Sequence, residues 1–313
     1  RKHNAPVIAA YKAKGVIAED DPLALGGAGL SPIADKELLP LVKSSDCVIL
    51  AGYDPIEMRI GWRDPFAESQ RVIDIAAVAN EHYMHQAPLN FIGDVAASLA
   101  ALSDGTPARA TWPGGEPAAV KARLKTAFRG DEDWGPAAIV DEARRACPAG
   151  TVATVDSGAH RIVLSHVWES DHVGGLLQST ALCTMGCAVP LAMGRKLAEP
   201  TRPVIAFVGD AGLEMFLGEL ATARDLKLGL PVIVFVDEQL ALIELKQRAQ
   251  QMPTVGVEFE GTDFTAVANA MGGVGVTVRD RAALSEAVHA SFERDTFTLI
   301  SALIGKNAYD GRI

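Results

Sequence analysis

Residues 203–240 decide the fold of this chain; they read PVIAFVGDAGLEMFLGELATARDLKLGLPVIVFVDEQL. The apolar run VIAFV ends at the small-residue turn GDAG, residues 209–212, and the apolar run VIVFV ends at Asp237. Such continuous apolar runs are typical of strands buried on both faces of a parallel sheet. Because the carboxyl ends of parallel strands meet at one edge of the sheet, Asp210 and Asp237, 27 residues apart, are predicted to lie at neighbouring strand ends.

Two carboxylates at neighbouring strand ends repel each other unless a cation lies between them. A hard divalent cation removes this conflict and can also bridge to phosphate oxygens. Mg²⁺ suits such a site, since it typically takes one or two carboxylates together with substrate phosphates. The small residues that follow allow close approach of backbone amides to a phosphate group. A helix-capping role for Asp210 is the structural alternative.

The composition indicates a soluble enzyme of two domains. The chain has 313 residues, of which 49% are hydrophobic and 22% are charged, so it can bury a substantial core. Its net charge of −10 argues against nucleic acid as a partner. No apolar run approaches the ~20 residues that cross a membrane, and no signal peptide is visible, so we expect no membrane association and a cytoplasmic location.

The cysteines are interpreted as structural. They lack the paired spacing of metal fingers, and Cys183 and Cys187 each lie in an apolar, small-residue run. We therefore expect buried, reduced thiols in a reducing compartment at all four positions, Cys47, Cys147, Cys183 and Cys187.

Strand and helix patterns alternate along the chain, which predicts an α/β fold with two doubly wound parallel-sheet domains. Residues 1–104 form the first domain, residues 105–134, rich in Gly, Pro and charge, form a linker, and residues 135–313 form the second domain. The expected strands are 6–10, 47–52, 72–75, 151–155, 204–208, 232–236, 274–278 and 298–303; the expected helices are 35–44, 95–102, 120–128, 137–146, 184–197, 218–227, 264–271 and 281–294.

Residues 150–305 resemble the diphosphate-binding (PP) domain of thiamine diphosphate-dependent enzymes of the acetolactate synthase and pyruvate decarboxylase superfamily. That family pairs a Gly-Asp-Gly or Gly-Asp-Ala turn with an Asn or Asp at the end of the next strand, which corresponds here to residues 209–211 and Asp237. The family's Glu-Leu-x-Thr-Ala helix is found at 219–223, and its Thr-Met-Gly turn at 184–186.

Residues 1–104 resemble the middle domain of the same enzymes, without its opening strands. Residues 15–29 match that domain's Lys-Gly-x-Ile-x-Glu-Asp-x-Pro pattern, of which the Lys is Lys14. Residues 52–57, together with 257–259 and 263–264, are similar to the catabolic, flavin-independent acetolactate synthases. The resemblance therefore implies that FAD is not a cofactor.

The resemblance implies a ligand set for thiamine diphosphate and Mg²⁺. The magnesium ligands would be Asp210, Asp237 and the backbone carbonyl of Gln239. A lone His is more often structural than a ligand, but here the resemblance places His160 at the diphosphate. Diphosphate contacts would come from Gly209, Ala211, Gly212, His160 and the backbone of Leu242. Met185 would pack beneath the cofactor between its two rings, and the carbonyl of Cys183 would accept a hydrogen bond from the aminopyrimidine.

The implied activity is acetolactate synthase-like decarboxylation and carboligation of 2-oxo acids. The alternatives are a simple 2-oxo acid decarboxylase and a non-catalytic cofactor-binding fragment or subunit of a split enzyme. The pyrimidine-binding domain and its catalytic glutamate have no counterpart in these residues, so no catalytic residue is assigned and the fragment alone is expected to be inactive. We expect that domain to belong to a preceding region or a separate chain, because the chain begins at Arg1. A dimer or tetramer is also implied. A nicotinamide-binding fold is disfavoured, since no Gly-x-Gly-x-x-Gly turn follows a strand.

Overall fold

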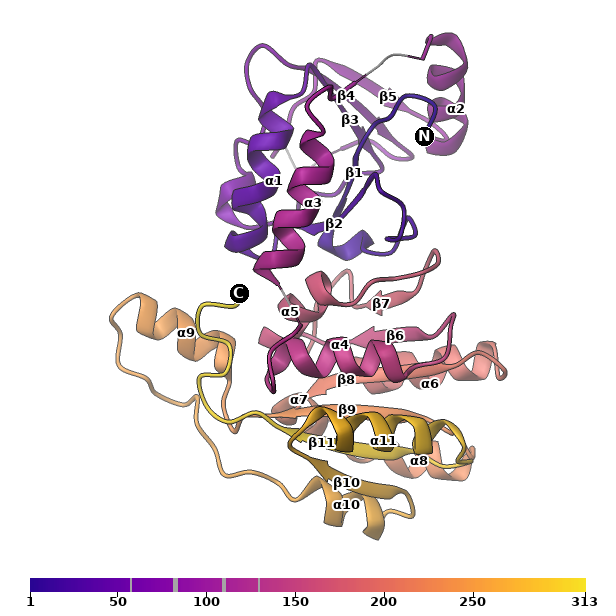
Figure 1. Ribbon diagram of the computed structural model, residues 1–313, viewed down its shortest axis with the longest axis vertical. Coiled ribbons are helices and arrows are strands. Elements are labelled where there is room, and N and C mark those ends of the chain that lie inside the picture. The colour runs from indigo at the N-terminus through magenta and orange to yellow at the C-terminus, as the bar shows by residue number, and fades with distance from the viewer. Residues whose placement is uncertain (57, 81–83, 109–110, 129) are drawn as a thin grey trace. The chain divides into compact units, whose positions relative to one another are not determined.

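The computed structural model describes residues 1–56, 58–80, 84–108, 111–128 and 130–313. The chain divides into two compact units, Arg1–Ala127 and Phe128–Ile313 (Figure 1). The expected linker, residues 105–134, contains helix α3, Glu116–Ala127, which packs on helix α1, Pro32–Ser44, within the first unit. Glu57, which ends the motif at 52–57, lies outside the described residues.

The first unit contains only parallel strand pairs among its described residues. Strands β1 and β2 pair with each other, and β3, β4 and β5 form a sheet in that order. Helix α1 begins after Ser31, whose hydroxyl accepts a hydrogen bond from the amide of Ala34, and Pro32 fills the first turn. The elements are β1 Val7–Ala10, η1 Tyr11–Ala13, β2 Ala24–Ala28, α1 Pro32–Ser44, β3 Cys47–Ala51, η2 Ile60–Trp62, β4 Arg71–Ala76, β5 Leu89–Ile92, α2 Val95–Gly105 and α3.

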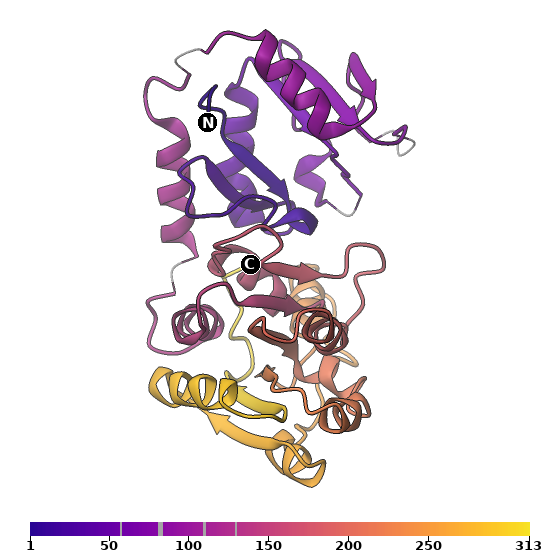
Figure 2. The ribbon, with the colours of Figure 1, turned by 90° about the vertical axis from the view of Figure 1, so that its right-hand side faces the viewer.

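The second unit is built on one six-stranded sheet in the order β10-β11-β9-β8-β6-β7, and every pair in it is parallel. Figures 1 and 2 show helices on both faces of this sheet, which confirms the predicted α/β fold. The elements are α4 Pro136–Ala146, β6 Val152–Val155, α5 Ala159–Val167, β7 Leu176–Gln178, α6 Ala188–Ala198, β8 Val204–Gly209, α7 Asp210–Glu214, α8 Glu219–Asp225, β9 Pro231–Val236, α9 Ala241–Ala249, α10 Phe264–Ala270, β10 Val274–Val278, α11 Arg281–Phe292 and β11 Thr298–Leu303.

The central strands are buried on both faces, as their apolar runs predict. Along β8, Ile205 and Phe207 join the core cluster that includes α4 and α11. The alternate residues Val204, Ala206 and Val208 join the cluster that includes α6, α8 and α10. Helices therefore bury both faces of these strands, and only the strand ends are left for polar residues. Within the described ranges, no helix has both the length and the apolarity to cross a membrane.

Two expectations are wrong. Cys47 is exposed rather than buried, because it shares the open face of β3 with Ile49 and Ala51, and Cys183 and Cys187 are only partly buried. None of the four cysteines forms a disulfide in the described parts of the chain. Helix α6 begins at Ala188 rather than at Thr184, because Gly186 adopts a left-handed conformation, with φ of 78°, that interrupts the helix.

The strand order reverses within the six-stranded sheet. The chain moves from β6 to β7 on one side and then returns to β8 on the other side of β6. The order thus reverses between β6 and β8, and ligands of open α/β sheets bind at the carboxyl ends of strands at such a reversal.

Candidate cofactor and metal site

Three aspartates follow three adjacent strands of the six-stranded sheet. Asp156 follows β6, Asp210 follows β8 and Asp237 follows β9. All three are buried, with at most 6% of each residue exposed. A buried carboxylate is unfavourable unless it has hydrogen-bond or charge partners. The partners of each aspartate therefore show what this edge of the sheet can bind.

Asp210 ties the ends of β8 and β9 together. Its Oδ1 accepts a hydrogen bond from the amide of Ala211 at 2.8 Å, and its Oδ2 accepts from the amides of Asp237 at 3.1 Å and Glu238 at 2.8 Å. Burial raises the pKa of Asp210, although these amides act against that rise. The sheet thus brings the carboxylate of Asp210 into hydrogen-bond contact with the backbone of Asp237, the second predicted metal ligand.

The pKa of Asp237 is raised further than that of Asp210. Burial, followed by the charge of Asp210, raises the pKa of Asp237 to about 7, and the hydrogen bond that its Oδ1 accepts from the amide of Gln239 at 3.3 Å only partly opposes this. A pair of carboxylates that cannot easily both ionise is the arrangement that a bound cation stabilises. Perturbed groups of this kind cluster at functional sites.

The loop that follows β9 is held by two later segments, at residues 257–258 and at Asn307. The side chain of Gln239 donates to Oε1 of Glu258 at 3.4 Å and accepts from the amide of Asn307 at 3.3 Å. Gln239 and Glu258 also form an antiparallel bridge, and the amide of Leu240 donates to the carbonyl of Val257 at 2.8 Å. These bonds fix the backbone at Gln239, whose carbonyl is the predicted third magnesium ligand.

His160 is oriented by Asp156. The Nε2 atom of His160 lies 2.7 Å from Oδ1 of Asp156, and its ring stacks on Phe235 with centroids 5.3 Å apart. A Cβ on Gly209 would lie 3.3 Å from the same ring. His160 therefore lies against the last residue of β8, next to Asp210, with one ring nitrogen already bonded to a carboxylate.

The predicted cradle around Gly212 is tightly packed. A Cβ on Gly212 would lie 2.3 Å from Oδ2 of Asp156 and 3.2 Å from the amide nitrogen of Gly186. Only glycine fits at this contact between the start of α7 and the turn before α6. The amide of Ala211 is bonded to Asp210, as noted above. Leu242 is the second residue of α9 and packs against a small buried cluster that contains Tyr309.

The turn at residues 183–186 carries Cys183 and Met185, both partly buried. The amide of Gly186 donates to Oδ2 of Asp156 at 2.5 Å. The amide of Cys183 donates to the hydroxyl of Ser179 at 3.0 Å, and the carbonyl of Cys183 accepts from the hydroxyl of Ser157. The structure thus brings this turn next to the ends of β6 and β8.

Three residues of this region were not assigned from the sequence. Asp156 and Ser157 directly follow β6, and Tyr309 belongs to the C-terminal segment. Burial raises the pKa of Tyr309, and the nearby charges of Asp237, Asp210 and Asp156 raise it further. Asp156 could have been found from the sequence, because it follows an apolar strand in the same way as Asp210. Ser157 and Tyr309 could not, because their partners lie far away in the sequence.

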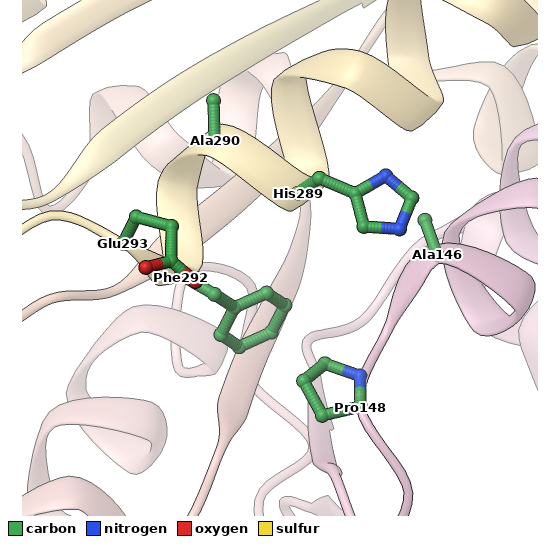
Figure 3. A pocket seen from close by; sticks show the side chains of 6 residues that line it. All are labelled: Ala146, Pro148, His289, Ala290, Phe292 and Glu293. Atoms are coloured by element: carbon green, nitrogen blue, oxygen red, sulfur yellow. The ribbon is translucent and has the colours of Figure 1, made fainter.

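A shallow pocket lies at the other edge of the sheet. It has a volume of about 290 Å³, and Figure 3 shows its six lining side chains. Pro148 precedes β6, while Phe292 and Glu293 precede β11, so the pocket is at the amino ends of the strands. It is separate from the three aspartates. Among the residues that the structure describes, no three His, Cys, Asp or Glu side chains gather to hold a metal.

Comparison with known proteins identifies both units. Residues 1–102 match the family described as the thiamine pyrophosphate enzyme central domain. Residues 156–302 match the thiamine pyrophosphate enzyme C-terminal TPP binding domain. The second match begins at Asp156, directly after β6, and runs into β11, so it contains Asp156, Asp210 and Asp237.

The chain is also similar to whole enzymes. It is 26% identical to acetolactate synthase of Bacillus subtilis (strain 168) over 287 residues, which cover 89% of this chain and 50% of that protein. It is 27% identical to catabolic acetolactate synthase of Raoultella terrigena over 264 residues, covering 82% and 47%. It is 27% identical to a probable 2-ketoarginine decarboxylase of Pseudomonas aeruginosa over 304 residues, covering 95% and 53%. The chain thus spans about half the length of these relatives, and it belongs to the superfamily of thiamine diphosphate-dependent enzymes that includes the acetolactate synthases.

Proposed function

We propose that this chain binds thiamine diphosphate together with Mg²⁺ at the carboxyl ends of β6, β8 and β9, and that it acts on 2-oxo acids. The buried pair Asp210–Asp237 carries the proposal. Oδ2 of Asp210 accepts a hydrogen bond from the backbone amide of Asp237 at 3.1 Å, and burial together with the charge of Asp210 raises the pKa of Asp237 to about 7. A divalent cation bound between these groups would allow both to ionise at neutral pH.

The available donors fit a hard cation. Two carboxylates and a backbone carbonyl, that of Gln239, are all oxygen ligands, and Mg²⁺ usually adds phosphate oxygens and water to such a set. Both oxygens of Asp210 already accept backbone hydrogen bonds, but a carboxylate has about four acceptor positions. The remaining capacity of Asp210 can therefore serve the metal while its backbone bonds keep it in place.

The surrounding residues supply the cofactor contacts. Gly209, Ala211 and Gly212 lie at the end of β8 and the start of α7, where small residues would permit close approach of a diphosphate. His160 and the backbone of Leu242 would add further contacts. Cys183 and Met185 lie on the turn before α6 and would contact the rings. When bound, thiamine diphosphate supplies the electron sink for decarboxylation, and the protein supplies binding, orientation and electrostatics.

We favour acetolactate synthase-like carboligation, because relatives of that name match along most of this chain. Simple decarboxylation is the second candidate, favoured by the decarboxylase relative that covers 95% of the chain. We further propose that a pyrimidine-binding domain, from a preceding region or a separate chain, completes the site in a dimer or tetramer. The chain alone would then bind the cofactor without turning over substrate. A set of 2-oxo acids, assayed with that domain present for carbon dioxide and for ligated product, separates the two reactions.

Calorimetric titration of the chain with thiamine diphosphate, with and without Mg²⁺, tests the binding proposal. At a ligand concentration of about one hundred times Kd, binding adds ~2.7 kcal/mol to stability, which raises Tm by several degrees. Asp210→Ala should abolish the Mg²⁺-dependent part of thiamine diphosphate binding. Asp310→Ala is the matched control, because Asp310 pairs with Arg248 through partly exposed side chains and is not a proposed ligand. Binding that is unchanged in Asp210→Ala would refute the metal assignment.

A further inference from the structure

The hydroxyl of Ser157 reaches across from the end of β6 to the turn before α6. It donates a hydrogen bond to the backbone carbonyl of Cys183, which is 26 residues further along the chain. Cys183 is the residue whose carbonyl is expected to meet the aminopyrimidine of the cofactor. A side chain that fixes this carbonyl would control how the ring is recognised.

Cys183 has a backbone conformation that needs outside support. Its φ is 49°, in the left-handed region that residues other than glycine rarely adopt. Strained conformations of this kind persist only where the surrounding structure enforces them. Hydrogen bonds hold both peptide groups of Cys183. The amide donates to the hydroxyl of Ser179 at 3.0 Å, and the carbonyl accepts from Ser157.

The neighbouring residue fixes the other end of the same turn. Oδ2 of Asp156 accepts a hydrogen bond from the amide of Gly186 at 2.5 Å. Two consecutive residues after β6 thus bond to both ends of the segment 183–186. Asp156 is buried and also bonded to His160, so it forms a rigid base for this connection. The turn is held against the same strand ends that carry the proposed metal site.

We propose that Ser157 is a positioning residue for the pyrimidine half of thiamine diphosphate. Its hydroxyl holds the carbonyl of Cys183 in the orientation that accepts a hydrogen bond from the ring amino group. A carbonyl oxygen can accept two hydrogen bonds, so the bond from Ser157 does not exclude a second one. This inference rests on the proposed function and adds a residue to it that touches neither the metal nor the diphosphate.

The test uses the 313-residue chain with Mg²⁺ and three probes. Thiamine diphosphate has the ring amino group, oxythiamine diphosphate has an oxo group in its place, and inorganic pyrophosphate has no ring. Calorimetry gives Kd for each probe with the wild type, Ser157→Ala and Ser157→Thr. Pyrophosphate binding also shows whether a variant keeps a folded site.

Ser157→Ala should weaken thiamine diphosphate binding about tenfold, as expected for loss of one supporting hydrogen bond. Binding of pyrophosphate and of oxythiamine diphosphate to Ser157→Ala should change less than about twofold by the same reasoning. Ser157→Thr keeps a hydroxyl, so its Kd for thiamine diphosphate should match that of the wild type. Equal weakening of all three probes, or no weakening of thiamine diphosphate binding, would overturn the inference. Tighter binding of thiamine diphosphate to Ser157→Ala would also overturn it, because Ser157 would then compete with the ring. A wild-type chain that binds none of the probes refutes the proposed function, and this inference with it.

Discussion

Replacement of Asp237 by Asn should stabilise the metal-free chain at pH 8. The pKa of Asp237 is about 7 in the folded protein against an ordinary value of 3.8. Between these two values the folded chain holds a proton that the unfolded chain has released. Stability therefore falls as the pH rises through this range, and the whole loss is present above pH 7.

The size of the effect follows from the same two values. A pKa that rises from 3.8 to about 7 on folding lowers the free energy of unfolding by ~4 kcal/mol at pH 8 and by ~2 kcal/mol at pH 5. Asn keeps an oxygen that can accept from the amide of Gln239, but its NH₂ group needs an acceptor, and a missing one costs ~1–3 kcal/mol. The net gain is then about 2 kcal/mol at pH 8 and close to zero at pH 5.

Urea unfolding followed by circular dichroism, in the presence of a chelator, measures this difference at both pH values. Asp310→Asn is the matched control. Hydrogen bonding to Arg248 lowers the pKa of Asp310, so removal of that charge should reduce stability at pH 8 rather than increase it. The reasoning fails if Asp237→Asn is no more stable than the wild type at pH 8, or if its gain is the same at pH 5.

Two further substitutions test the packing of the site. Gly212→Ala should lower stability by about 1–3 kcal/mol and weaken cofactor binding, since the new Cβ would meet Asp156 at 2.3 Å. Gly218→Ala, which has open space, should leave both unchanged in the same urea and calorimetric assays. Tyr309→Ala should cost ~3–5 kcal/mol by emptying a buried site, whereas Tyr309→Phe should retain most of the stability in differential scanning calorimetry. Equal Tm values for the Ala and Phe variants would contradict this burial argument.

The parts of the fold that were predictable are those with a continuous local signal. Strands β8 and β9 are apolar at every position because helices cover both faces, so their ends, and hence Asp210 and Asp237, could be located from the sequence. The short strands β5 and β7 were not predicted, since three or four residues carry too little periodicity. Helix α6 was extended too far, because only the conformation of Gly186 separates the turn from the helix.

The contacts that shape the candidate site depend on residues that are distant in sequence. The carbonyl of Cys183 is fixed by Ser157, and the side chain of Gln239 is fixed by Asn307, 68 residues away. Neither pair belongs to a repeating pattern, so local sequence preferences do not predict these two hydrogen bonds. The sequence thus predicts which strand ends carry the charged ligands, because strand burial determines them. The orientation of the Cys183 carbonyl depends on the long-range hydrogen bond from the Ser157 hydroxyl, whereas Gln239 is held by the backbone amide of Asn307. Substitution of Ser157 is therefore the change that separates ring recognition from metal binding.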